Sequence, residues 1–117
     1  MSTPSPLEIA EFRGDGISSE LSAAVHAVAD ALPIDINFHD VDLTLERRST
    51  DAEGSYDDAE KAMRKYRVAM KYPTVTEDVS PNKVLRDRLD FAVIHRPVAT
   101  IPGVGTRIRG TVDLHVV

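Results

Sequence analysis

The chain has 117 residues, of which 42% are hydrophobic and 28% charged, and its formal net charge is −5. These values indicate one globular domain with its own core, and they exclude wholesale disorder and a coiled coil. No apolar run approaches the roughly 20 residues of a membrane span. With no cysteine, disulfides and thiolate metal sites are excluded. An acidic chain with few aromatic residues is not expected to bind nucleic acid.

The amino-terminal region lacks the pattern of a secretory signal, so we expect a cytoplasmic protein. Residues 1–6 are small, polar and proline-containing, which predicts a disordered lead-in to a single domain over 7–117. The alternation of residues 7–12 predicts a strand, and the glycines of 13–16 predict a turn. Ser18 or Ser19 is then expected to cap a helix that runs to about residue 32.

The middle of the chain predicts a strand, a loop, a helix and a short strand. Residues 34–43 alternate apolar and polar with one slip at His39, which predicts a strand with a bulge. The polar residues 44–54 predict a loop. Ser55 is expected to cap a helix to about residue 66, and 67–70 reads as a short strand.

The last third contains the clearest helix start in the chain, Ser80 followed by Pro81, which predicts a helix over 81–89. Residues 91–98 are a nearly continuous apolar run, typical of a strand inside a parallel sheet. Residues 112–117 predict a final strand, which follows a non-helical connection and is free to pair antiparallel. The order of elements predicts an α/β fold with a small, mainly parallel sheet covered by helices.

The start of the helix at residue 81 is also the best candidate binding site. A helix N-terminus attracts anions, and Ser80 and Asn82 add polar groups there. Arg86 follows on the same helix and Arg96 on the next predicted strand, and two guanidiniums can grip a carboxylate or a phosphate. The alternative is a well-capped surface helix whose arginines are solvated.

The four histidines show no spacing typical of metal ligands, so no metal site is predicted. His26 and His95 are candidates for acid–base catalysis, because imidazole titrates near neutral pH. A purely structural role is the alternative for both.

Four segments resemble the isocitrate and isopropylmalate dehydrogenase family, most closely its NAD-dependent isocitrate dehydrogenase type. They are, in the family's order, IAEFRGDGI, KYPTVTE, SPNKVLRDRLDFAVIHRPVATIPGVGTR and VDLHVV. The resemblance implies that Ser80, Asn82, Arg86 and Arg96 bind substrate carboxylates and that Thr76 lies near the nicotinamide.

The chain also departs from this family. It corresponds to roughly the family's amino-terminal third, so the catalytic tyrosine and lysine, the metal-binding aspartates and most of the adenosine site have no counterpart. Tyr72 stands where the family has a glycine, and its ring is expected to crowd a dinucleotide. The resemblance therefore implies a protein that uses neither NAD nor Mg²⁺ or Mn²⁺ and is not a stand-alone dehydrogenase.

Three functions remain open from the sequence. The first is a catalytically incomplete domain that binds an anionic carboxylate or a protein partner. The second is an enzyme recruited for a non-redox reaction of a carboxylate, such as isomerisation, cyclisation or elimination. The third is a subunit that completes an NAD(P)-dependent dehydrogenase with another chain. Because the strand at 112–117 needs a cover, we expect at least a homodimer, with a dehydrogenase or pathway protein as a possible further partner.

Overall fold

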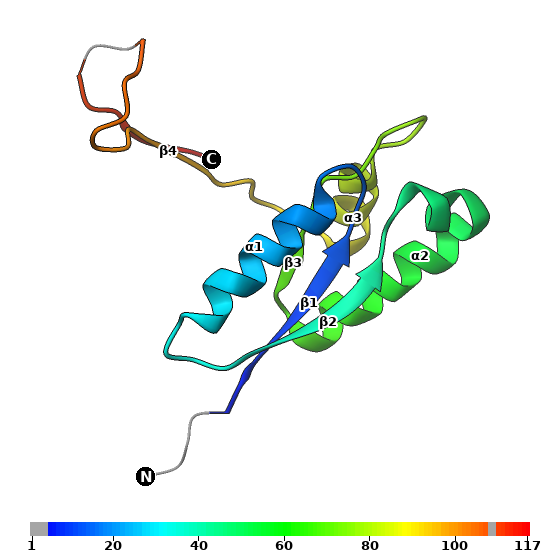
Figure 1. Ribbon diagram of the computed structural model, residues 1–117. Coiled ribbons are helices and arrows are strands. Elements are labelled where there is room, and N and C mark those ends of the chain that lie inside the picture. Colours follow the sequence, from blue (N-terminus) through cyan, green and yellow to red (C-terminus); the bar gives the residue numbers. More distant parts are fainter. Residues whose placement is uncertain (1–4, 108–109) are drawn as a thin grey trace.

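The computed structural model describes residues 5–107 and 110–117, and it has two sheets (Figure 1). Three parallel strands form the first sheet in the order β2-β1-β3, and β4 and β5 pair antiparallel in a separate sheet. The α/β class with a small parallel sheet is thus confirmed. In chain order the elements are β1 (Leu7–Arg13), α1 (Ser18–Asp30), β2 (Ile36–Asp42), α2 (Leu45–Tyr66), β3 (Ala69–Lys71), α3 (Pro81–Leu89), β4 (Arg96–Ala99) and β5 (Asp113–Val116).

The parallel sheet lies between two helical layers, with α1 on one face and α2 and α3 on the other (Figure 1). The central strand β1 is therefore buried on both faces from Ile9 to Phe12. Phe12 points into the main core, which lies on the α2 and α3 side. The other members of that core are Ala10, Val41, Leu43, Tyr56, Ala59 and Leu85.

The pairing of β1 with β2 is continuous, from Leu7 opposite Ile36 to Arg13 opposite Asp42. The bulge predicted at His39 is therefore wrong. The imidazole of His39 hydrogen-bonds Glu8 across the strands and stacks on Tyr66 at 4.1 Å. The slip instead marks a change of buried face: Phe38 stacks on His26 of α1, whereas Val41 belongs to the core on the α2 side, and the register continues unbroken.

The start of α1 also differs from the expectation. The helix begins after Ile17, whose side chain makes no capping bond, so neither predicted serine is the N-cap. The Oγ atom of Ser18 instead accepts a hydrogen bond from the backbone N–H of Gly14, at 2.9 Å. The serine stabilises the turn that precedes the helix rather than the helix end itself.

The segment 44–54, predicted as a loop, is the first half of α2. Thr44 is the N-cap, and its Oγ1 accepts from the N–H of Arg47. The helix is kinked at Asp51, where the carboxylate accepts from the N–H of Gly54, the bond that an N-cap makes three residues on. Ser55, expected as a cap, lies inside this helix and is fully buried.

The apolar run at 91–98 is not a strand of the parallel sheet. Residues 91–95 have no regular structure, and only Arg96–Ala99 form β4, paired with β5. All residues from 91 to 99 are exposed. Apolar composition predicted burial here, but no element of the described chain covers this segment.

Two expectations concern the chain as a whole. In the described residues, no helix is both long and apolar enough to cross a lipid bilayer. The predicted lead-in at 1–6 falls mostly on residues 1–4, which lie outside the described residues; residues 5 and 6 are exposed and belong to no helix or strand.

Candidate functional site

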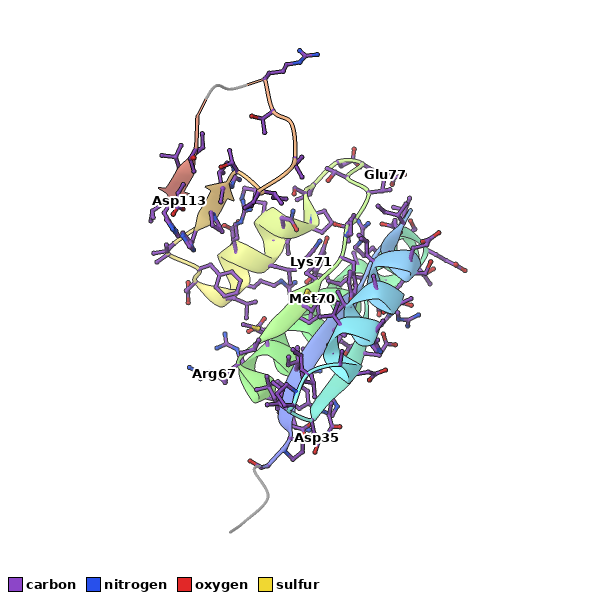
Figure 2. The ribbon with its side chains drawn as sticks, turned by 60° about the vertical axis from the view of Figure 1, so that its left-hand side comes forward. Asp35, Arg67, Met70, Lys71, Glu77 and Asp113 are labelled. Carbon is purple, nitrogen blue, oxygen red and sulfur yellow. The ribbon has the colours of Figure 1, made fainter. Side chains whose placement is uncertain are left out.

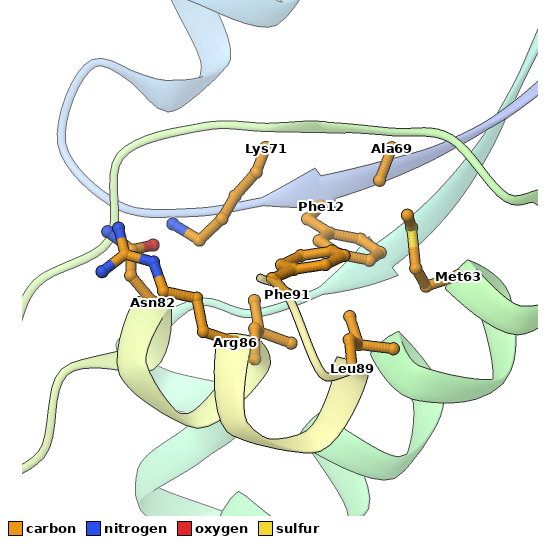
Figure 3. A pocket seen from close by; sticks show the side chains of 9 residues that line it. Phe12, Met63, Ala69, Lys71, Asn82, Arg86, Leu89 and Phe91 are labelled. Carbon is orange, nitrogen blue, oxygen red and sulfur yellow. The ribbon is translucent and has the colours of Figure 1, made fainter. Parts of the chain in front are cut away.

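A cleft of about 270 Å³ opens between the sheet and α3, on the α2 side of β3 (Figure 3). The cleft lies at the edge of the sheet, because β3, which contributes Ala69 and Lys71 to its lining, is a short edge strand. The residues that line it are Phe12, Met63, Ala69, Lys71, Asn82, Leu85, Arg86, Leu89 and Phe91.

One end of the cleft is polar. Lys71 ends β3, and Asn82 and Arg86 lie one turn apart on α3, so the three side chains meet at this end (Figure 3). The Nζ atom of Lys71 donates to the carbonyl of Tyr72 at 2.9 Å and to Oγ1 of Thr74 at 3.0 Å. Among the described residues, two cationic side chains and no carboxylate line the cleft.

The charges at this end are incompletely compensated. Burial lowers the pKa of Lys71, and the nearby positive charge of Arg48 lowers it further, although Asp15 acts in the opposite direction. Across residues 5–107 and 110–117, neither the Arg86 guanidinium nor the Asn82 side-chain amide has a hydrogen-bond or ion-pair partner. Five guanidinium N–H donors therefore face solvent at the mouth of the cleft.

The other end is apolar. Phe12 forms the floor and is 3% exposed, whereas Phe91 forms the outer wall and is 49% exposed. Met63 and Leu89 lie beside these rings in Figure 3. A molecule that fits this cleft would combine an anionic group with an apolar group, which is the usual division of polar and apolar contacts in small-molecule sites.

The structure brings only some of the predicted site residues together. Asn82 and Arg86 line the cleft, and Ser80 is the N-cap of α3, as predicted from Ser80 and Pro81, although its hydroxyl makes no capping bond. Arg96 begins β4, is exposed and does not line the cleft. Thr76 lies in an exposed loop. Lys71 was missed, because a lysine at the end of a short strand carries no recognisable pattern.

A second polar cluster surrounds Glu11 on the α1 side of the sheet. The carboxylate, 6% exposed, accepts hydrogen bonds from the Tyr72 hydroxyl at 2.7 Å and the Ser22 hydroxyl at 2.9 Å, and Nε2 of His26 lies 2.9 Å away. Burial alone would raise the pKa of Glu11, because it disfavours the charged carboxylate. The hydrogen bonds from Tyr72, Ser22 and His26 outweigh this effect and lower the pKa. Burial, and then the bond to Glu11, raises the pKa of Tyr72 to about 12.

The Glu11 cluster bears on two expectations. Tyr72 turns toward α1, on the sheet face opposite the cleft, and so does not fill the cleft. His26, a candidate acid–base residue, is held by Glu11 and stacks on Phe38 with centroids 4.2 Å apart. A glutamate amid the apolar residues of a central strand was the signal that such a cluster exists.

The second candidate histidine, His95, follows the cleft residue Phe91 by four positions but does not itself line the cleft. Its Nε2 atom is 2.7 Å from Nδ1 of His115, and the His95 ring, just before β4, stacks on the His115 ring of β5. Both histidines are exposed. Within residues 5–107 and 110–117, no three His, Asp or Glu side chains are placed to hold a metal ion together.

The fold and the cleft together define a small α/β domain with an amphipathic cleft between β3 and α3. The chain matches no protein-family model and no curated protein. The resemblance to isocitrate and isopropylmalate dehydrogenases therefore stays a prediction.

Proposed function

We propose that this domain binds a small carboxylate in the cleft between β3 and α3. The observation that carries the proposal is the unpartnered guanidinium of Arg86 beside Asn82 and Lys71, in a cleft without any acidic lining residue. A bidentate bond from Arg86 to a carboxylate would satisfy donors that have no described protein partner. The same anion would also favour the charged form of Lys71, which burial disfavours.

The apolar end sets the second requirement of the ligand. Phe12, Met63 and Phe91 offer carbon surface but no hydrogen-bonding side-chain groups apart from the thioether. Each methylene buried there adds roughly 0.8 kcal/mol, or about a four-fold gain in affinity. We therefore expect carboxylates with an aliphatic or aromatic tail to bind more tightly than acetate.

Titration calorimetry with acetate, butyrate, hexanoate and benzoate tests this proposal, with hexanamide as the uncharged analogue. We expect affinity to rise from acetate to hexanoate and hexanamide to bind at least ten-fold more weakly than hexanoate, since charged hydrogen bonds contribute about 1.5–3 kcal/mol each. Equal binding of hexanoate and hexanamide, or no binding of either at millimolar concentration, would refute the proposal.

Matched arginine variants locate the site. Arg86→Ala should weaken hexanoate binding about ten-fold or more, whereas Arg96→Ala, an exposed arginine outside the cleft, should leave it unchanged. A loss confined to Arg96→Ala would place the site elsewhere.

Adding NAD or NADP with isocitrate and following absorbance of the reduced nucleotide tests the dehydrogenase alternative: reduced nucleotide formed by the pure protein would favour that function over simple binding.

A further inference from the structure

The segment 91–117, here called the arm, begins at Phe91, which still lines the β3–α3 cleft, and its later residues stand apart from the rest of the domain. Its strands β4 and β5 pair only with each other, and the arm extends away from α2 in Figure 1. The radius of gyration, 17.0 Å, exceeds the roughly 13 Å of a compact chain of this length. A two-stranded hairpin is marginal on its own, so it needs a covering surface.

The arm is also the most apolar part of the exposed surface. Nine of the nineteen exposed large hydrophobic residues of the described chain lie on it, although it holds less than a quarter of the residues. Val98 pairs with Leu114, and Arg96 pairs with Val116, so the alternation of the strands places these four on one face. That face is apolar with an arginine at its edge.

Charge identifies the kind of surface that the arm fits. Residues 91–117 contain three arginines and one aspartate, giving +2, whereas residues 1–90 contain eleven basic and eighteen acidic residues, giving −7. A second copy of this chain therefore offers the arm a surface of opposite charge. Electrostatic complementarity of this kind steers association and selects the partner surface.

A specific groove on that surface has matching chemistry. It measures about 310 Å³ and lies between α2 and the loop before α3, with Ala52, Tyr56 and Val84 among its apolar lining. Glu77 and Asp78 stand at its rim, exposed and without a described side-chain partner. An apolar floor with a carboxylate rim complements an apolar strand face with an arginine at its edge.

We propose that the arm of one copy docks in the α2 groove of a second copy. Figure 2 shows that Asp113 of the arm and Glu77 of the groove lie well apart in space within one copy of the chain. Reciprocal docking around a two-fold axis uses both arms and both grooves, and so closes the assembly as a dimer. The arm shares Phe91 with the β3–α3 cleft, but its docking requires no ligand in that cleft.

Sedimentation equilibrium of the full chain, with charge-reversed variants, tests the proposal. We expect the wild type to be a dimer at tens of micromolar. Arg96→Glu with Arg107→Glu, which reverses the charge of the two exposed arginines in the described part of the arm, should raise the dissociation constant at least ten-fold. Glu77→Lys with Asp78→Lys should have the same effect. Mixing the two variants should restore a dimer, because each reversed arm then meets a reversed groove.

The control is Lys61→Glu with Arg67→Glu, which makes the same change in net charge on exposed residues outside the arm and the groove. This variant should remain dimeric, and circular dichroism should show all variants folded. A monomeric wild type, a dimer that survives arm reversal, or a mixture that fails to associate would overturn the proposal. Nucleic acid bound to the wild type and lost on arm reversal would also overturn it, in favour of a nucleic-acid partner.

Discussion

Removing the Tyr72 hydroxyl, which donates a hydrogen bond to the buried carboxylate of Glu11, should lower the stability of the fold by a predictable amount. In Tyr72→Phe the ring and its packing remain, but Glu11 loses the shortest of its three hydrogen bonds, 2.7 Å from the phenol oxygen. A hydrogen bond to a charged group contributes about 1.5–3 kcal/mol. Since Glu11 is only 6% exposed, water cannot replace the lost donor, and we expect the free energy of unfolding to fall within that range.

The effect should depend on pH in a defined direction. Because the fold lowers the pKa of Glu11, its charge stabilises the protein above the ordinary value of 4.5, and this contribution is lost as pH falls through the lowered pKa. The difference between wild type and Tyr72→Phe should therefore be full at neutral pH and should shrink below pH 4.5. A tyrosine ionisation at about pH 12 should also disappear in the variant.

Urea denaturation of the two proteins at neutral and acidic pH measures these differences. Tyr66→Phe is the matched control, because the described residues give its hydroxyl no hydrogen bond while its ring also packs against the sheet, on His39. Equal loss of stability in the two variants, or a loss in Tyr72→Phe that does not change with pH, would refute the role assigned to Glu11.

Two further changes test the turn that follows β1. Asp15→Ala should cost about 3–5 kcal/mol in urea denaturation, since it leaves the nearly buried guanidinium of Arg48 without its carboxylate; a loss below about 1 kcal/mol would contradict this. Gly14→Ala should lower the melting temperature, because a Cβ at this position would lie 1.9 Å from the carbonyl oxygen of Pro73. Gly105→Ala, where a Cβ meets open space, should change the melting temperature little, and equal effects of the two would argue against the close approach.

The predictions that succeeded rest on local chemistry. Ser80 and Pro81 fix the start of α3, because proline suits the first helical position whatever surrounds it. The alternation of residues 7–12 likewise marked β1 correctly. Both signals depend on a few neighbouring residues, so distant parts of the chain do not alter them.

Some of the predictions that failed overlooked local signals, and others depended on distant contacts. The start of α2 was missed because residues 44–54 are polar and none of them is buried, although Thr44 caps the helix locally by accepting from the N–H of Arg47. Ser55 has the composition of a cap, but Asp51 takes that role at the kink. Residues 91–98 have the composition of a buried strand, yet nothing in the described chain covers them. The cleft depends on the distance between β3 and α3, which no sequence pattern encodes.

The thin apolar attachment of α1 has a consequence for how the domain opens. Only Ser18 and Ala29 of this helix are buried, while Leu21 and Val28 are exposed, so the Glu11 cluster provides much of its link to the sheet. A helix attached in this way can detach without disrupting the core around Phe12. Its backbone amides should therefore exchange with deuterated solvent sooner than those of β1, through local opening rather than through unfolding of the whole domain.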